Sequence, residues 1–210
     1  MSIILKKYKG DVNLPKYDNI LKFYEDYCKL EQIKRTGWLM RKVPAERLES
    51  VGDHTLQTVM LASVLARELN IEIDLLKLME MLMIHDIGEI KTGDVASVDV
   101  DAAIKKQNEY LHAYEILSSL SADTRDYYYS LWEEMNKKET DLAKFAYCID
   151  KIDAVIKAGL YERQYNLSDL FSEFYEYQKN RQTFNGSLLD ELFEYLEKYQ
   201  SMDNNSPKTI

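Results

Sequence analysis

The scarcity of helix-breaking residues is the sequence feature that most constrains how this chain can fold. Its 210 residues include only seven glycines and three prolines, and runs that alternate strictly between apolar and polar residues are scarce. Apolar residues recur instead at helical spacing, for example between His54 and Leu69. The sequence therefore predicts an all-α helical bundle.

Helical periodicity divides the chain into segments separated by short polar or glycine-containing stretches. Loops are expected over 35–51 and 91–100. Asp74 is a candidate N-cap, and Gly159 and Asn185-Gly186 are expected to end helices. The predicted helices cover 17–34, 54–69, about 75–88, 101–120, 123–136, 139–161, 168–181 and 187–200.

No repeat or linker divides the chain, so residues 1–200 are expected to form one domain, followed by a polar tail over 201–210. Hydrophobic residues make up 46% of the sequence, which is enough for the core of such a domain. No apolar run is long enough to span a membrane, and lysines interrupt the apolar N-terminus too early for a secretory signal. Cys28 and Cys148 are too isolated for a disulfide framework. We therefore expect a cytoplasmic protein without a membrane partner.

The formal net charge of −9 restricts the partners that the surface attracts. Such a surface disfavours nonspecific binding to the backbone of a nucleic acid polymer. It also repels a small phosphate ester. If the ligand is anionic, the site must therefore carry local positive charge, which a metal ion and an arginine would supply.

Three histidines occur in the chain, and two of them stand beside an aspartate. His54 follows Asp53, whereas His85 precedes Asp86 at the end of the apolar run Leu75–Ile84. An imidazole and a carboxylate at the end of a buried helix cost free energy unless something binds them. A divalent metal ion would bind both.

Two consecutive antiparallel helices would bring these pairs together, because His54 lies at the start of one and His85-Asp86 near the end of the next. Asp150, an acidic residue in an apolar stretch, is the best candidate for a fourth ligand from a later helix. Each pair alone fits an ordinary histidine at a helix end, but the set of four favours a metal site. Two imidazoles and two carboxylates suit Mn, Fe, Co, Zn or Mg. His112 has no acidic neighbour and is interpreted as a helix-surface residue.

The order His, His-Asp, Asp on a helical bundle resembles the HD-domain metal-dependent phosphohydrolases. Within them it is most similar to the 5′-deoxynucleotidase branch, which contains the YfbR-like enzymes and the relatives of HD-domain-containing protein 2. The resemblance implies an HD-domain helical bundle whose motifs span about residues 17–165. It rests on Arg35-Thr36-Gly37-Trp38, Glu49-Ser50-Val51-Gly52-Asp53-His54, His85-Asp86-Ile87-Gly88-Glu89, Thr92-Gly93-Asp94 and Cys148-Ile149-Asp150-Lys151.

Two positions depart from the family pattern. Gly88 stands where many members have alanine before the glutamate, and Arg35 and Trp38 are three residues apart where others place them side by side. Because of the second departure, Arg41 and Arg47 remain alternatives to Arg35 as the phosphate-binding arginine.

The resemblance implies hydrolysis of deoxyribonucleoside 5′-monophosphates to a deoxynucleoside and phosphate. One alternative is an HD-type hydrolase of another phosphate compound, such as a cyclic nucleotide, an alarmone or a nucleoside triphosphate. A second alternative is a non-catalytic bundle that binds a nucleotide. Retention of the candidate metal ligands and of Glu89 favours an enzyme.

The expected cofactor is one divalent ion, Mn, Co, Fe, Zn or Mg, held by His54, His85, Asp86 and Asp150. Such an ion lowers the pKa of bound water and polarises a phosphoryl oxygen. Glu89 lies three residues after Asp86, so both carboxylates project from one face of the helix end. Glu89 is therefore the candidate general acid/base.

Asp94 is the second candidate catalytic residue, because its glycine-containing loop can fold back and orient the water or a sugar hydroxyl. Arg35 would form charge-assisted bonds to the phosphate. Trp38 would offer a flat face to the sugar or base. The expected substrate-binding residues are Arg35, Trp38, His54, Asp94 and Ser97.

The resemblance also implies a homodimer. Aromatic residues in the C-terminal helices would form an apolar surface patch on a monomer, and such patches usually mark contact sites. The residues of this expected patch are Phe171, Phe174, Tyr175 and Tyr177. The alternative is that the same residues pack back onto the core as lid helices.

Overall fold

The computed structural model describes residues 14–94 and 102–203, and the regular structure in these ranges is helical apart from one isolated bridge between Lys34 and Ser50. The predicted all-α class is therefore confirmed. The α-helices are α1 (Leu14–Cys28), α2 (Thr36–Leu39), α3 (Val51–Glu68), α4 (Leu75–Ile84), α5 (Glu89–Thr92), α6 (Ala102–Leu117), α7 (Ala122–Lys137), α8 (Asp141–Tyr165), α9 (Leu170–Asn180) and α10 (Asp190–Asp203), with 3-10 turns η1 (Lys29–Glu31) and η2 (Ala45–Arg47).

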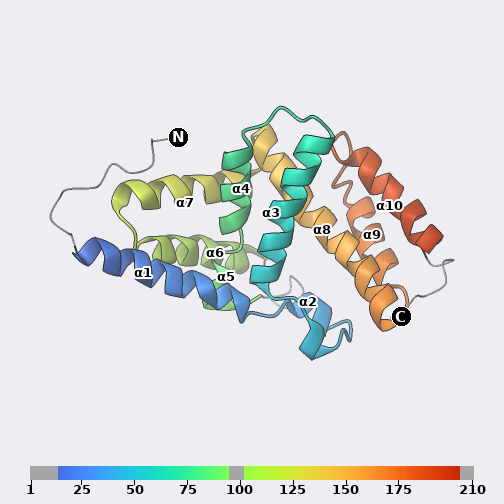
Figure 1. The fold of residues 1–210 in the computed structure, drawn as a ribbon, viewed down its shortest axis with the longest axis horizontal. Helices are drawn as coiled ribbons and strands as arrows, with labels where there is room; N and C mark the ends of the chain where they lie inside the picture. The colour runs from blue at the N-terminus through green and yellow to red at the C-terminus, as the bar shows by residue number, and fades with distance from the viewer. Residues whose placement is uncertain (1–13, 95–101, 204–210) are drawn as a thin grey trace, which may run out of the picture.

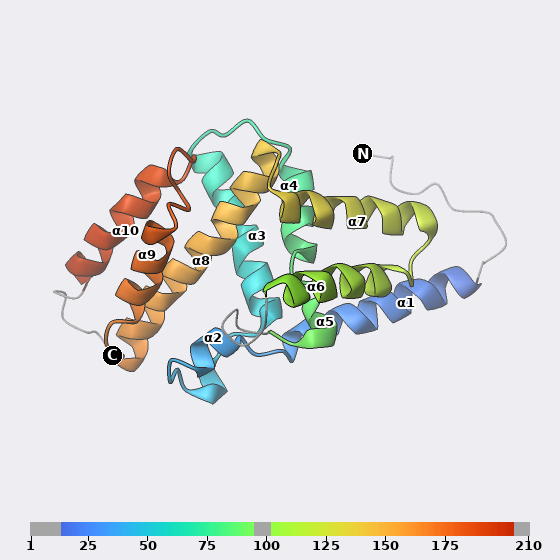
Figure 2. The same cartoon turned by 180° about the vertical axis from the view of Figure 1, so that it is seen from behind.

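The long helix α8 runs through the middle of the molecule, and the other helices lie on both sides of it (Figure 1). Helices α3 and α4 are antiparallel neighbours, and both pack against α8. Helices α9 and α10 cover one side of this central group, while α1, α6 and α7 lie on the other (Figure 2). The beginning of α3, the end of α4 and the middle of α8 consequently converge.

The buried side chains form three clusters, and α4 contributes to two of them. Leu82 belongs to the largest cluster, which also holds Ile149 of α8, whereas Ile84 belongs to a second cluster with Trp132 of α7. The third cluster surrounds Trp38. Because α4 is packed on two sides, its C-terminal end has a fixed position.

A capping box fixes the beginning of α3. The Ser50 side chain accepts a hydrogen bond from the Asp53 backbone N–H, and the Asp53 carboxylate accepts one from the Ser50 N–H. The helix thus starts at Val51, three residues earlier than predicted. His54 lies in its first turn, and the Arg35 N–H donates to the Glu49 carbonyl just before it.

Three further features differ from the prediction. Helix α4 is N-capped by Asp74 as expected, but it ends at Ile84, and a separate short helix, α5, follows a turn. Helix α5 extends through Thr92 into the predicted loop. The expected loop over 35–51 contains the short helices α2 and η2.

Gly159 does not end a helix, because α8 continues through it to Tyr165 and stops at Asn166 in the left-handed conformation. A Cβ atom at Gly159 would lie 2.7 Å from Gln200 Oε1 and 3.2 Å from Phe171 Cδ2. This glycine therefore serves the close approach of α9 and α10 to α8.

The expected aromatic patch on α9 is largely absent from the surface. Phe171 and Tyr175 are buried, and Tyr175 stacks on Phe193 of α10. Phe174 stacks on Trp38, which leaves Tyr177 exposed. These rings pack onto the core, so the predicted contact surface for a second subunit is wrong.

Two expectations about the chain as a whole can be compared with the described residues. None of the helices within 14–94 and 102–203 combines the length and the apolarity needed to cross a membrane. Both cysteines are free thiols, as expected, with Cys148 buried and Cys28 partly exposed.

Candidate metal centre

The four predicted metal ligands meet where α3, α4 and α8 converge. His54 Nε2 lies 3.1 Å from Asp150 Oδ1, and His85 Nε2 lies 3.9 Å from the same oxygen. One ligand atom from each of these three residues lies within 4.8 Å of the other two. Asp86 Oδ2 borders the group at 3.0 Å from His85 Nε2 and 3.9 Å from His54 Nε2.

Both imidazoles are oriented by a contact to the nitrogen that faces away from the cluster. The Nδ1 of His85 lies 2.6 Å from the Leu82 carbonyl, to which it donates. The Nδ1 of His54 lies 2.8 Å from Asp153 Oδ2. A hydrogen bond at Nδ1 leaves the Nε2 lone pair for a metal, which is the arrangement found around metal-binding histidines.

The atoms of this cluster fit a divalent metal ion. His85 Nε2 is buried and has no hydrogen-bond partner among the described residues, although Asp86 Oδ2 lies 3.0 Å away. A buried nitrogen lone pair costs free energy without a partner. Two imidazole nitrogens beside the carboxylates of Asp86 and Asp150 form a donor set that suits Mn, Fe, Co, Zn or Mg.

The carboxylates also make the cluster strongly negative. Burial and Arg35 lower the pKa of His54, but hydrogen bonds with the two aspartates of α8 raise it to about 9. Burial raises the pKa of Asp86, yet its electrostatic interactions with His85, His54 and Arg35 hold it well below its usual range. Burial likewise opposes the low pKa of Asp150, which Lys151 and His54 maintain. The site therefore favours positive charge.

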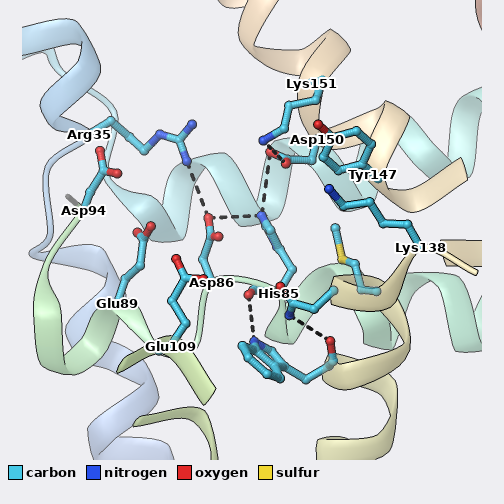
Figure 3. Close-up of a pocket in the computed structure, with 14 residues that line it drawn as sticks. Arg35, His85, Asp86, Glu89, Asp94, Glu109, Lys138, Tyr147, Asp150 and Lys151 are labelled. Carbon is cyan, nitrogen blue, oxygen red and sulfur yellow. Dashed lines mark hydrogen bonds and ion pairs between the residues drawn. The ribbon is translucent and has the colours of Figure 1, made fainter. Parts of the chain in front are cut away.

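A pocket of about 290 Å³ opens in front of the cluster, and its two walls differ in chemistry (Figure 3). Arg35, Glu89, Asp94 and Glu109 lie on one side of Asp86, whereas Lys138, Tyr147 and Lys151 lie on the other. His85 and Asp150 line the pocket between them. His54 is fully buried and does not line it, so the structure gives no support to direct contact between His54 and a substrate.

Of the three arginines considered from the sequence, Arg35 lines the pocket. Its Nη1 lies 3.5 Å from Asp86 Oδ2. Asp94 lies beside it, where its Oδ2 accepts a 2.6 Å hydrogen bond from the Thr36 backbone N–H. Arg41 instead pairs with Glu173 on α9, and neither Arg41 nor Arg47 is among the pocket-lining residues.

Trp38 has no face available for a sugar or base, which contradicts its predicted role. The side chain is 2% exposed, and its ring stacks on Phe174 and meets the edge of Tyr161. Its Nε1 donates a 2.7 Å hydrogen bond to Glu49, whose other oxygen lies 3.1 Å from Lys157 Nζ. Trp38 is thus a core residue of the segment that carries Arg35.

The remaining residues named from the sequence differ in whether they line the pocket. Glu89 and Asp94 both line the pocket, as their assignment to catalysis requires. His112 lies on α6, is partly buried and does not line the pocket. Ser97 lies outside the described residues. Gly88 permits α5 to approach α6, because a Cβ atom there would lie 3.3 Å from the Glu109 carbonyl oxygen.

Several residues that line the pocket or orient a candidate metal ligand were not assigned from the sequence. Asp153 could have been found, because it follows Asp150 by three residues on the same face of a helix. Glu109 and Lys138 lie outside every motif read from the sequence, and Tyr147 comes just before the motif around Asp150; the packing of α6, α7 and α8 brings all three to the pocket.

Comparison with known proteins supports this arrangement. Residues 28–188 match the family described as HD domain. The protein named 5′-deoxynucleotidase HDDC2 in Dictyostelium discoideum is 33% identical over 152 residues, which cover 70% of this chain and 79% of that protein. Its human namesake is 29% identical, with 75% of this chain and 76% of that protein covered.

Solved structures show the same fold. A conserved hypothetical protein from Pyrococcus furiosus has a TM-score of 0.66 and 26% identity, with 90% of this chain and 99% of that chain covered. A predicted metal-dependent phosphohydrolase from Magnetospirillum magnetotacticum has a TM-score of 0.67 at 22% identity, with 90% and 95% covered. The extent of the family match shows that this chain belongs to the HD-domain family.

Asp153→Asn is expected to weaken binding of Mn²⁺ or Co²⁺ by roughly 10–100-fold, because the carboxylate that orients His54 is lost while the ligands remain. Calorimetric titration of the metal-free protein measures this change. Asp141→Asn, an exposed acid at the start of the same helix, serves as the control and should bind as the unmodified protein does. Equal affinities for Asp153→Asn and the unmodified protein would contradict the orienting role.

Proposed function

We propose that this protein is a metal-dependent phosphomonoesterase that hydrolyses deoxyribonucleoside 5′-monophosphates to a deoxynucleoside and phosphate. The observation that carries the proposal is the convergence of His54, His85 and Asp150 beside a pocket that also presents Glu89 and Arg35. The names of the relatives, 5′-deoxynucleotidases, support this substrate class.

We assign one divalent ion to His54, His85, Asp86 and Asp150. When bound, it would polarise a phosphoryl oxygen and make hydroxide available from water near neutral pH. Its identity among Mn, Co, Fe, Zn and Mg is left open by this mixed donor set.

The protein's own residues supply binding and proton transfer. Arg35 lies at the edge of the metal cluster, where its guanidinium can form charge-assisted bonds to phosphate oxygens. Glu89 gives a proton to the leaving ester oxygen and takes one back from the attacking water, so that a deoxynucleoside and inorganic phosphate result. Asp94 holds the Thr36 amide and thereby positions the adjacent Arg35.

The size of the pocket and the net charge of the protein favour a small nucleotide as the substrate. The pocket of about 290 Å³ is at the small end for ligand sites, which favours a monophosphate over a larger alarmone. The net charge of −9 disfavours a nucleic acid polymer. We place this activity in the cytoplasm, which agrees with the free thiols.

The proposed activity is tested with the metal-loaded protein and a panel of deoxynucleoside and ribonucleoside monophosphates, cyclic nucleotides and nucleoside triphosphates. Phosphate release from at least one deoxynucleoside monophosphate is expected, and a chelator should abolish it because the metal ion would make hydroxide available and polarise the phosphoryl oxygen. Turnover confined to another phosphate compound would redirect the substrate assignment. No turnover of any compound would contradict the enzyme.

Glu89→Ala should lower the turnover number by about 10²–10⁴, because the general acid/base is lost while the metal ligands remain. Asp86→Ala should lose both activity and metal. Steady-state kinetics and elemental analysis of both variants separate these effects. A Glu89→Ala protein that no longer binds metal would identify Glu89 as a ligand and refute its assignment to proton transfer.

We propose a homodimer that forms through α3 rather than α9. Leu56, Met60 and Val64 recur every fourth residue on one face of α3, and they are 69%, 62% and 42% exposed. A contiguous apolar stripe of this kind usually marks a contact site, and two-fold dimers bring the same surface of both copies together.

Light scattering at micromolar concentration is expected to give the mass of a dimer, and Met60→Glu should give that of a monomer, because it places like charges in the contact. Leu76→Glu replaces an equally exposed leucine on α4 and should remain dimeric. The proposed surface is ruled out if Met60→Glu stays dimeric, and the dimer itself is ruled out if the unmodified protein is monomeric.

A further inference from the structure

The two walls of the pocket differ in the number of cations and carboxylates that they carry. On one wall Arg35 is accompanied by the carboxylates of Glu89, Asp94 and Glu109. On the opposite wall Lys138 and Lys151 lie around Tyr147 (Figure 3). Among the pocket-lining side chains the acids outnumber the bases, so the position of each cation determines where an anionic group can bind.

The charge of Arg35 is largely matched by the protein itself. The carboxylates of Asp86 and Asp94 lie beside this guanidinium (Figure 3). The nearest of these oxygens, Asp86 Oδ2, lies 3.5 Å away. A phosphate that contacts Arg35 alone gains one cation but approaches several carboxylates, so further positive charge has to come from elsewhere in the pocket.

The opposite wall has the reverse balance, because two lysines lie there beside one carboxylate, that of Asp150. Lys151 Nζ lies 2.6 Å from Asp150 Oδ2, and this ion pair fixes the position of the first ammonium group. Lys138 Nζ lies 3.7 Å from the centre of the Tyr147 ring, close enough for a cation–π contact. This contact holds a second ammonium group at the pocket.

The backbone also fixes the position of Lys138. It is the C-cap of α7, with φ of 55° and its N–H donating to the Glu134 carbonyl. The side chain therefore leaves the chain at the turn between α7 and α8, directly beside Tyr147. The side chains at the end of one helix and in the second turn of the next thus build this part of the wall.

We propose that Lys138, held against Tyr147, and Lys151 form the binding wall for the non-bridging oxygens of the substrate phosphate. This inference rests on the proposed phosphomonoesterase function. A phosphate bound between the lysines and the metal ligands turns its ester oxygen toward Glu89, on the acidic wall. The sugar hydroxyls of the nucleoside then face Asp94 and Glu109, whose carboxylates accept hydrogen bonds but repel phosphate.

The test measures binding of inorganic phosphate to the metal-loaded protein by calorimetry, together with competitive inhibition by a deoxynucleoside. Lys138→Met keeps the length of the side chain but removes its charge. It is expected to weaken phosphate binding roughly tenfold or more and to leave deoxynucleoside inhibition unchanged. Lys138→Arg should keep most of the phosphate affinity. Lys137→Met, whose parent lysine pairs with Glu133, is the matched control and should behave as the unmodified protein.

Each result decides between named alternatives. Unchanged phosphate affinity in Lys138→Met, or no measurable phosphate binding by the unmodified protein, overturns the inference. Weakened deoxynucleoside inhibition with intact phosphate binding would overturn it too, because Lys138 and Tyr147 would then contact the nucleoside. If Lys138→Met loses phosphate affinity but the unmodified protein hydrolyses no nucleotide, the phosphate wall stands and the proposed enzymatic function fails.

Discussion

The contact of His54 with two aspartates of α8 is the interaction on which the rest of the structure depends. Its fully buried ring lies between Asp150 at Nε2 and Asp153 at Nδ1. Both carboxylates must lie on the part of α8 that faces His54, and the capping box at Ser50 must fix the position of the first turn of α3. A buried imidazole is tolerated only with both partners in place. The site therefore forms only when α3 and α8 pack against each other in this register.

The negative potential of the metal cluster explains the distribution of charge around it. Carboxylates from the turn after α4 and from α8 would repel one another and a phosphate unless cations offset them. The protein supplies those cations at separate places, with Arg35 at one wall and Lys138 and Lys151 at the other. A divalent ion between the walls would complete the balance. In this way a protein of net charge −9 can present a binding site for an anion.

The helices and the convergence of the candidate metal ligands were predictable because they leave local patterns. Helical periodicity is a property of consecutive residues, and the histidine–aspartate pairs lie at helix ends. Burial of Trp38 and the α9 rings was not predictable, since these side chains pack against elements far away in sequence. Gly159 was misjudged for the same reason, because its neighbours come from α9 and α10. Lys138 and Tyr147 reach the pocket only through the packing of α7 against α8.

The metal content of the purified protein tests the central claim most directly. After loading with Mn²⁺ or Co²⁺ and removal of the excess, elemental analysis should find one divalent ion per chain. His85→Ala should lose it, because that variant removes the buried nitrogen for which the described residues offer no hydrogen-bond partner. Absence of bound metal in the unmodified protein under every loading condition, or full retention in His85→Ala, would contradict the account.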